Sequence, residues 1–181
     1  PKVSHPEMVA QLRPISLCNV CYKVITKIIV NRLRPLLKDL VGPNQTSFCP
    51  GRYTTDNVII IQEMIHTMKR KKGKKGYVSI KVDFEKAYDR VRWDFLQQTL
   101  EFVGIPQDLI ALIMNCVQAE SMEILWNGKR SEPFTPQRGI WQGDPIFPYL
   151  FILYMERLSH MINRAAGERR WRRLKASRLG P

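Results

Sequence analysis

The feature that most constrains this chain is an alternating stretch that ends in a carboxylate. From Val78 to Val82 every second side chain is apolar, and those between are polar. This period of two is typical of a strand with one buried face. Asp83 closes the stretch, and the polar sequence after it does not continue a strand. A carboxylate at a strand end suits a metal-dependent phosphoryl-transfer site, and the alternative is an aspartate that caps the next turn.

The chain is strongly basic, and its excess charge is concentrated in two runs. Among 181 residues, 29 Lys and Arg face 16 Asp and Glu, which gives a formal net charge of +13. Residues 69–75 and 169–178 hold six basic residues each. Such runs are either solvated loops or sites for an anionic partner, and nucleic acid is the anion we expect. No apolar run is long enough to span a bilayer, so we expect no membrane partner and an intracellular protein.

The spacing of the cysteines does not match that of a complete metal site. Cys18 and Cys21 form one Cys-x-x-Cys pair inside a helical pattern, without a second pair or a suitably spaced histidine. Zinc sites of this kind need four such ligands. We therefore expect four reduced thiols, as is usual inside cells.

The remaining pattern predicts helices and one hairpin. Helical periodicity covers residues 17–37 with a break at Pro35, 57–70 with a cap at 54–56, 93–103, 106–118 and 149–164. Asn127-Gly128 between two extended runs predicts a hairpin over residues 122–134. This order favours an α+β fold in which helices pack on a small antiparallel sheet.

Four segments, taken together, resemble the reverse transcriptase domain of non-LTR (LINE-type) retrotransposons, particularly those of plants. Residues 13–17, Arg-Pro-Ile-Ser-Leu, resemble the first motif of that family, and residues 45–52 resemble the second. Residues 81–91 resemble motif A, and residues 137–151 resemble motif B. Each segment alone is weak evidence for the family. Their order and spacing together favour the interpretation of Asp83 as a metal ligand.

The resemblance implies the fingers and part of the palm of a right-hand polymerase. Residues 1–76 would be fingers-like, 77–167 palm-like and 168–181 a basic tail. The implied reaction is RNA-directed DNA synthesis, in which a dNTP is added to the 3′-hydroxyl of a DNA primer on an RNA template. Two Mg²⁺ ions would serve that reaction. The family's habit of priming on chromosomal DNA implies a nuclear location.

The resemblance also assigns roles near the reacting groups. Asp83 would be the catalytic metal ligand of motif A, and Phe84 could add its backbone carbonyl. Tyr88 would abut the incoming sugar and exclude a 2′-hydroxyl, with core packing as the alternative. Gln142 and Gly143 would lie beside the nucleotide and template, since glycine lets the backbone approach closely.

Further residues match family positions that hold phosphates. Arg13 and Lys2 match positions for the triphosphate, to which a guanidinium donates forked hydrogen bonds. Arg52 and Arg138 are assigned to the template, although Arg52 could instead anchor its own loop. We interpret Asp144, which precedes a proline and a helix, as a helix cap rather than a metal ligand.

Departures from the family pattern limit what carries over. Trp141 stands where motif B usually has Arg, and Phe147 where it usually has Ser in a tight turn; both resemble the drift of an unselected copy. No Asp-Asp pair occurs, and the sequence stops before the aromatic-Ala-Asp-Asp strand of the family. The family's endonuclease domain and thumb are also missing. We therefore expect a fragment whose intact parent is the enzyme and which alone is inactive.

Two other hypotheses stay open at this point. The chain could be a non-catalytic remnant that binds nucleic acid through its two basic runs, with steep salt dependence. It could also fail to fold alone, because a palm without its Asp-Asp hairpin would expose a sheet edge and apolar surface.

Overall fold

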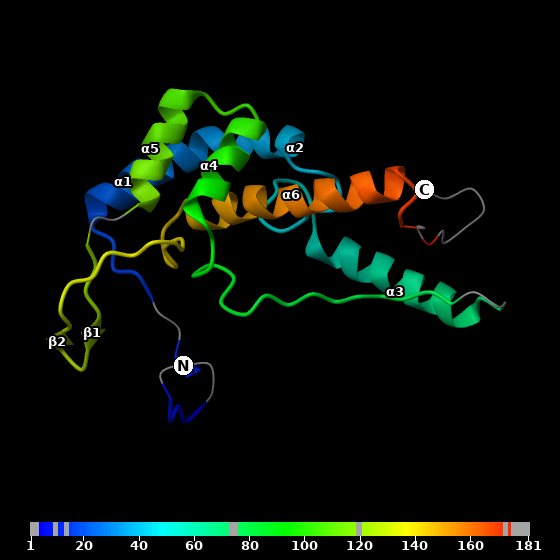
Figure 1. Ribbon diagram of the computed structural model, residues 1–181, viewed down its shortest axis with the longest axis horizontal. Coiled ribbons are helices and arrows are strands. Elements are labelled where there is room, and N and C mark those ends of the chain that lie inside the picture. Colours follow the sequence, from blue (N-terminus) through cyan, green and yellow to red (C-terminus); the bar gives the residue numbers. More distant parts are fainter. Residues whose placement is uncertain are drawn as a thin grey trace.

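The fold is a helical body from which one hairpin and one long helix project (Figure 1). The structure is a computed structural model that describes residues 4–8, 11–12, 15–72, 76–118, 121–171 and 174. Its elements are α1 (Val20–Leu33), the 3₁₀ helix η2 (Arg34–Leu36), α2 (Leu37–Leu40), α3 (Thr54–Arg70), α4 (Trp93–Phe102), α5 (Gln107–Val117), β1 (Leu125–Trp126), β2 (Lys129–Arg130) and α6 (Phe147–Gly167). Helices and a two-stranded antiparallel sheet in one chain confirm the predicted α+β class.

The core of the body lies among α1, α4, α5 and α6. Helix α4 contacts both α5 and α6, and α1 contacts α5. Each helix contributes one stripe of aliphatic side chains, and the largest fully buried ones include Ile29, Leu33, Leu96, Leu100, Ile113 and Leu153. Burial of such stripes, more than intrinsic propensity, stabilises short helices. These four helices therefore form the rigid support for the loops between them.

The first helical segment breaks where the sequence predicts. Asn19 caps α1 by accepting a hydrogen bond from the backbone N–H of Tyr22 at 2.7 Å. Pro35 lies in η2, after which α2 resumes. Only part of the predicted apolar stripe is buried, because Leu17 and Val24 are exposed whereas Ile29 is buried. The helix thus has an apolar face for which the described residues provide no cover.

The predicted hairpin is confirmed. In β1 and β2, Leu125 pairs with Arg130 and Trp126 with Lys129. Asn127 and Gly128 in the turn have φ angles of 49° and 78°, the left-handed conformation that a tight hairpin requires. All four strand residues are exposed. Among the described residues the helices pack mainly on one another, and the small antiparallel sheet projects from that body (Figure 1).

The strand predicted to end at Asp83 is not formed in the described part of the chain. Residues 76–84 are extended but have no strand partner there. Val78, Ile80 and Val82 are 84%, 79% and 60% exposed. The alternation was a correct sign of extended backbone, but a strand also needs a neighbour to accept and donate its ladder hydrogen bonds.

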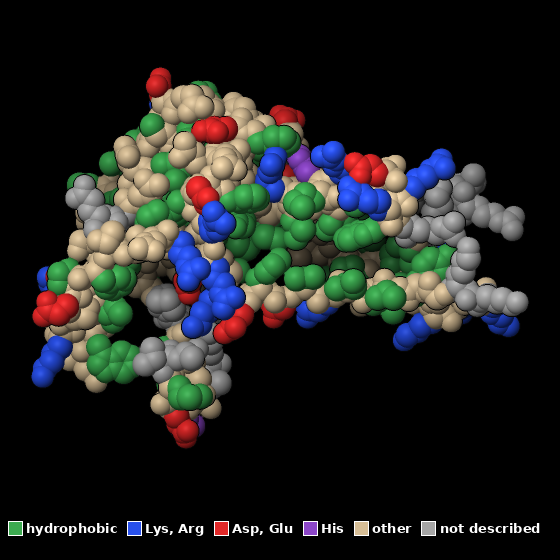
Figure 2. Space-filling view, viewed as in Figure 1, with side chains coloured by type: hydrophobic (Ala, Val, Ile, Leu, Met, Phe, Trp, Pro, Cys, Tyr) green, Lys and Arg blue, Asp and Glu red, His purple; other side chains and the backbone are tan. Residues whose placement is uncertain are grey.

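Helix α3 carries seven large apolar side chains, yet none of its seventeen described residues is buried. It begins at Thr54, and its N-cap residue, Tyr53, makes no side-chain hydrogen bond, so the predicted cap at 54–56 is wrong. Figure 2 shows hydrophobic side chains lining a hollow between α3 and α6. At its far end, a cavity of about 540 Å³ is lined by residues that include Met68, Ile80 and Trp171.

No helix in the ranges given above has both the length and the apolar character that crossing a membrane requires. This finding concerns the described residues and no others.

Candidate nucleotide and template site

The motif B loop, residues 137–145, lies between two other motif segments. Its backbone is bonded on one side to the segment of the first motif and on the other to the turn that follows Asp83. The bonds run from Ser16 N–H to Gln142 O (2.9 Å), from Gly139 N–H to Val91 O (2.8 Å) and from Ile140 N–H to Tyr88 O (3.1 Å). Three segments that are distant in sequence thus meet at one loop.

Two glycines allow this close approach. Gly139 has φ +101°, and a Cβ there would lie 3.3 Å from the carbonyl oxygen of Asp89. Gly143 has φ +110°, and a Cβ there would lie 3.4 Å from the carbonyl oxygen of Ser16. Both angles are unfavourable for residues with a side chain. The close backbone approach expected at Gly143 is therefore present, with the first motif as the neighbour.

Asp144 forms the buried base of the loop. One carboxylate oxygen accepts a hydrogen bond from the backbone N–H of Ile146 at 3.1 Å. The other accepts one from the Tyr22 hydroxyl at 2.7 Å. Since the N-cap residue of α6 is Ile146, Asp144 caps the turn before the helix and not the helix itself. The predicted capping role is right in kind, but Asp144 lies two residues before the N-cap position.

The predicted metal site is incomplete in the described residues. Asp83 and Phe84 are both exposed. Among the residues with described positions, no group of three or more His, Cys, Asp or Glu could hold a metal ion. A single carboxylate does not provide the shared ligands that two Mg²⁺ ions need. The donor set present therefore does not fit the implied metals, and the roles of Asp83 and Phe84 stay predictions.

Tyr88 packs against the start of α6. Its ring centroid lies 4.3 Å from that of Phe147 and 4.6 Å from that of Phe151, in edge-on contacts. This geometry supports the core-packing alternative, while the contact of Tyr88 with a sugar stays a prediction. Phe147 is the first residue of α6, and its N–H donates to the Asp144 carbonyl at 3.3 Å, which closes the tight turn before the helix. Trp141, the other departure, donates from Nε1 to the Cys116 carbonyl at 3.2 Å.

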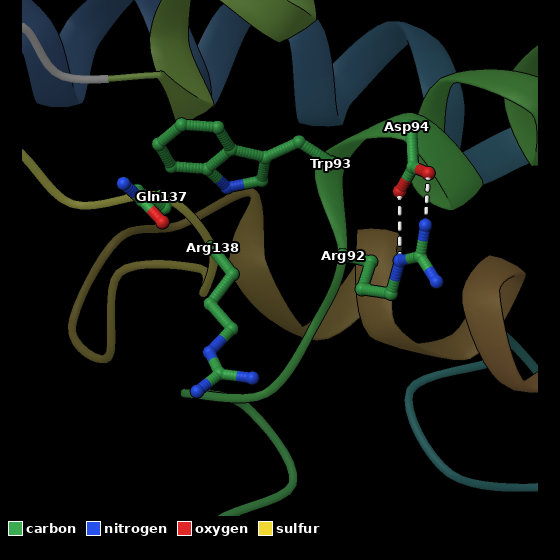
Figure 3. Close-up of a pocket in the computed structure, with 5 residues that line it drawn as sticks. All are labelled: Arg92, Trp93, Asp94, Gln137 and Arg138. Carbon is green, nitrogen blue, oxygen red and sulfur yellow. Dashed lines mark hydrogen bonds and ion pairs between the residues drawn. The ribbon is translucent and has the colours of Figure 1, made fainter.

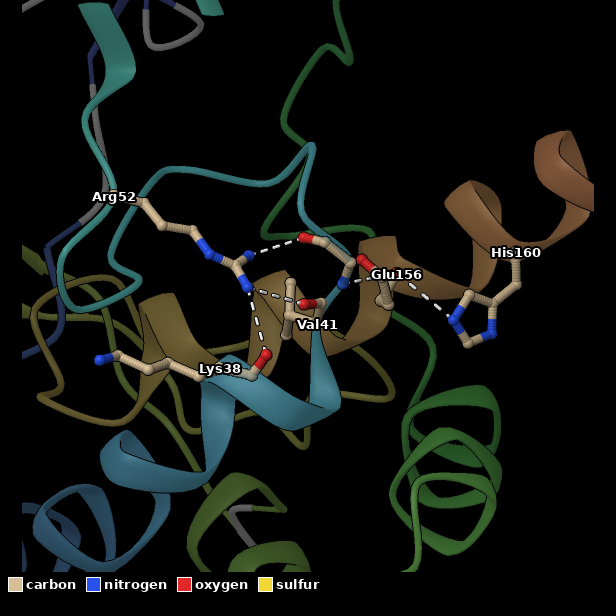
Figure 4. Close-up of polar contacts among 6 residues, drawn as sticks. Lys38, Val41, Arg52, Glu156 and His160 are labelled. Carbon is tan, nitrogen blue, oxygen red and sulfur yellow. Dashed lines mark hydrogen bonds and ion pairs between the residues drawn. The ribbon is translucent and has the colours of Figure 1, made fainter. Parts of the chain in front are cut away.

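Arg52 anchors its own loop (Figure 4). Its guanidinium donates to four backbone carbonyl oxygens, those of Gly42 (2.6 Å), Gln45 (2.8 Å), Val41 (3.1 Å) and Lys38 (3.2 Å). Glu156 of α6, which is buried, accepts from the Gly42 N–H at 3.1 Å and lies 3.3 Å from Nε2 of His160. Hydrogen bonds from a charged guanidinium to backbone carbonyls are stronger than those between neutral groups. The geometry supports the anchoring alternative, and template contact stays a prediction.

Arg138 lines a cavity of about 520 Å³ together with Arg92, Trp93, Asp94 and Gln137 (Figure 3). Arg92 is paired with Asp94, and this hydrogen bond holds the pKa of Asp94 below its ordinary value. Arg138 is exposed and has no hydrogen-bond or ion-pair partner among the described residues. It could therefore receive a phosphate, although its template role stays a prediction.

The cysteines are all free thiols within the described ranges. Burial is the main cause that raises the pKa of Cys18, Cys49 and Cys116, so their thiols stay protonated. Arg13 and Lys2 lie outside the described residues, and their contacts with the triphosphate stay predictions.

Comparison with known families decides what kind of domain this is. The family model described as "Reverse transcriptase (RNA-dependent DNA polymerase)" matches residues 1–176. This chain belongs to the reverse transcriptase family. The match includes all four motif segments, so the meeting of three of them at residues 137–145 is a feature of a reverse transcriptase domain.

Relatives of this reverse transcriptase domain come from transposable elements, in agreement with the predicted class. It is 29% identical over 156 residues, or 86% of its length, to the uncharacterized 149 kDa protein of transposon TX1 from Xenopus laevis. It is also 29% identical over 158 residues, or 87%, to the Pol polyprotein of retrotransposable element R2DM from Drosophila melanogaster. The chain spans only 12% and 15% of these two relatives.

Some residues of this reverse transcriptase domain were missed from the sequence. Trp93 donates from Nε1 to the Gly139 carbonyl at 2.7 Å and so joins α4 to the motif B loop. Tyr22 joins α1 to Asp144. Neither residue was assigned a role from the sequence. The available signal was an aromatic residue with a polar atom in the first turn of each helix, since such atoms usually find a partner when buried.

Proposed function

We propose that this chain is the fingers and part of the palm of a non-LTR retrotransposon reverse transcriptase, a protein that copies RNA into DNA. Residues 1–76 would belong to the fingers, 77–167 to the palm and 168–181 to a basic tail. The supporting observation is the motif B loop, which is bonded both to the first motif and to the turn after Asp83. A nucleotide between those segments would contact Gln142 and Gly143.

The other side chains would act as phosphate and sugar contacts around that nucleotide. Arg13 and Lys2 would neutralise the triphosphate, and Tyr88 would border the sugar. Arg138, exposed beside Trp93, would contact a template phosphate. An arginine donates two parallel hydrogen bonds to a phosphate, which fixes position as well as charge.

The proposal places two Mg²⁺ ions only in a longer protein. Asp83, with the carbonyl of Phe84, offers one carboxylate, and the described residues provide no further cluster. The remaining carboxylates would come from another segment of a longer protein. The two relatives described above are much longer than this chain and so have room for such a segment. The extended residues 76–84 would pair with a strand of that segment, which would also cover Val78 and Ile80.

A primer-extension assay tests the proposal. The 181-residue chain, given an RNA template, a labelled DNA primer, dNTPs and Mg²⁺, is expected to bind the hybrid without extending it. A longer protein that carries the Asp-Asp segment should extend the primer and lose that activity in Asp83→Asn, but not in the exposed control Asp94→Asn. Extension by the 181-residue chain that Asp83→Asn abolishes would refute the predicted inactivity.

A second candidate function is non-catalytic nucleic-acid binding. It is favoured by exposed basic residues at the ends of two helices, which include Arg70 at the end of α3, Lys72 after it, and Arg169 and Arg170 after α6. Such contacts weaken steeply with salt and tolerate any sequence. Replacing these residues by glutamine should then abolish hybrid binding, whereas Arg138→Gln should not.

Origin and location form a further part of the proposal. Origin from a plant element is consistent with 44% identity over 55 residues to an uncharacterized mitochondrial protein of Arabidopsis thaliana. We also propose a nuclear location, because such elements prime on chromosomal DNA. Imaging of a fluorescent fusion in plant cells would test it, and an exclusively cytosolic signal would count against it.

A further inference from the structure

Three parts of the fold converge on the hydroxyl of Tyr22. Tyr22 belongs to the first turn of α1, and its hydroxyl oxygen lies 2.7 Å from Oδ2 of Asp144 in the motif B loop. It lies 2.6 Å from the carbonyl oxygen of Cys116, near the end of α5. Trp141 donates to that same carbonyl at 3.2 Å. Helices α1 and α5 are thereby joined to both ends of the segment 141–144.

Because this network is buried, the loss of one of its hydrogen bonds would leave a polar atom without a partner. Asp144 is only 4% exposed, so its carboxylate must be satisfied by protein groups. Oδ1 accepts from the Ile146 N–H, and Oδ2 accepts the single hydroxyl proton of Tyr22, because a charged carboxylate is a stronger acceptor than the Cys116 carbonyl. Burial, followed by the bond to Asp144, raises the pKa of Tyr22, so the phenol stays a neutral donor. Without that hydroxyl, Oδ2 would lack its donor.

The segment that this network supports is the part of the loop nearest the proposed nucleotide. The Asp144 N–H donates to the Trp141 carbonyl at 3.2 Å, which closes a turn over Gln142 and Gly143. In the described part of the chain, one further backbone bond, from the Ser16 N–H to the Gln142 carbonyl, holds the tip of that turn. The orientation of the turn therefore depends on its base, where Tyr22 acts.

We propose that Tyr22 is a positioning residue for the nucleotide-contacting turn 141–144, on which it acts through Asp144. The nucleotide part of this statement rests on the proposed function, whereas the positioning part does not. Helix α1 thereby carries a determinant of the active site, although it contributes no group to the nucleotide.

Hydrogen exchange in the 181-residue chain tests the positioning directly. In Tyr22→Phe we expect amide exchange at Asp144 and Ile146 to rise about tenfold, as the loss of one buried hydrogen bond implies. Amides of α4, which contributes no group to the hydrogen bonds of this network, should exchange at the wild-type rate. The matched control is Tyr53→Phe, whose ring is exposed at the start of α3. Equal acceleration in α4 and in the loop, or none in the loop, would overturn the proposal.

A double variant separates positioning through Asp144 from a general packing effect. Asp144→Ala should accelerate exchange at Ile146 at least as much as Tyr22→Phe does. If Tyr22 acts through Asp144, adding Tyr22→Phe to Asp144→Ala changes nothing further in the loop. Additive acceleration in the double variant would contradict the proposal, and this comparison is still available if one single variant is less stable.

A binding measurement distinguishes a failure of the role proposed for Tyr22 from a failure of the proposed function. The chain is mixed with a fluorescein-labelled RNA–DNA hybrid, and the affinity for dNTP is measured by anisotropy in each variant. Tyr22→Phe is expected to weaken dNTP binding about tenfold while hybrid affinity stays within about twofold. Absence of dNTP binding in the wild type would count against the proposed function, whereas the exchange result would still decide the role of Tyr22.

Discussion

Helices α3 and α5 are both rich in aliphatic residues, yet they differ sharply in how much of each is buried. Four of the eleven residues of α5 are buried, whereas none of the seventeen residues of α3 is. Helix α5 lies against α1 and α4, while α3 and the extended residues 76–84 border an open hollow (Figure 2). The comparison teaches that local sequence determines the type of an element, whereas its burial depends on partners elsewhere.

The largest expected effect comes from removing one isoleucine from each helix. Ile113 of α5 is fully buried and Ile60 of α3 is 57% exposed. Ile113→Ala should lower the free energy of unfolding by about 2–5 kcal/mol because it leaves a cavity, and Ile60→Ala by less than about 1 kcal/mol. Urea denaturation followed by circular dichroism measures both. Similar losses would break the comparison by showing that α3 is buried in solution.

The next largest effect is expected at Arg52. Its substitution decides whether this residue anchors its loop or contacts the template. Arg52→Lys keeps the charge but loses the fork that reaches four carbonyls, and should cost about 2–3 kcal/mol of stability. The matched control Arg138→Lys should leave the melting temperature unchanged and weaken hybrid binding instead. A stable Arg52→Lys protein with impaired hybrid binding would restore the template role.

A smaller effect is expected from the indole that joins α4 to the motif B loop. Trp93→Phe removes the hydrogen bond to the Gly139 carbonyl and should cost about 1–2 kcal/mol. Trp126→Phe, in the exposed hairpin, is the control and should cost less than about 0.5 kcal/mol. Thermal melts of the two variants measure the difference, and equal melting temperatures would argue against this link.

The smallest effect on stability is expected at the exposed ion pair between Arg92 and Asp94. Arg92 lowers the pKa of Asp94, so the stabilisation is present above the ordinary pKa of an aspartate, about 3.9, and is lost as pH falls through the lower folded value. Arg92→Gln should therefore raise the pKa of Asp94 without a measurable change in melting temperature. A carboxyl ¹³C titration measures this, and an unchanged midpoint would contradict the pairing.

Much of the body could be predicted from the sequence because its signals are local. The break at Pro35, the hairpin turn at Asn127-Gly128 and the chain reversal just after α4 at Gly104, which has φ +80°, all depend on the conformational limits of single residues. The need for glycine at position 143 was likewise visible from its motif. The first three features need no knowledge of distant contacts, whereas the close approach at Gly143 is expected only through the family resemblance.

The rest of the fold depended on distant contacts. The alternation before Asp83 could not show whether a neighbouring strand exists, and the apolar pattern of α3 could not show what covers it. The roles of Tyr22 and Trp93 depend on acceptors in a loop more than 40 residues further along the chain. Helical periodicity places such residues in a core, but it does not identify the acceptor of a single hydroxyl or indole N–H.

One measurement tests most directly the central claim that the nucleotide lies at the meeting of three motif segments. A photoreactive dNTP is cross-linked to the chain in the presence of an RNA–DNA hybrid, and the labelled peptides are sequenced. We predict labels within residues 137–145 and 83–91 that unmodified dNTP competes away. Labels confined to the basic runs around 69–72 and 169–171, or no competition by dNTP, would contradict this claim.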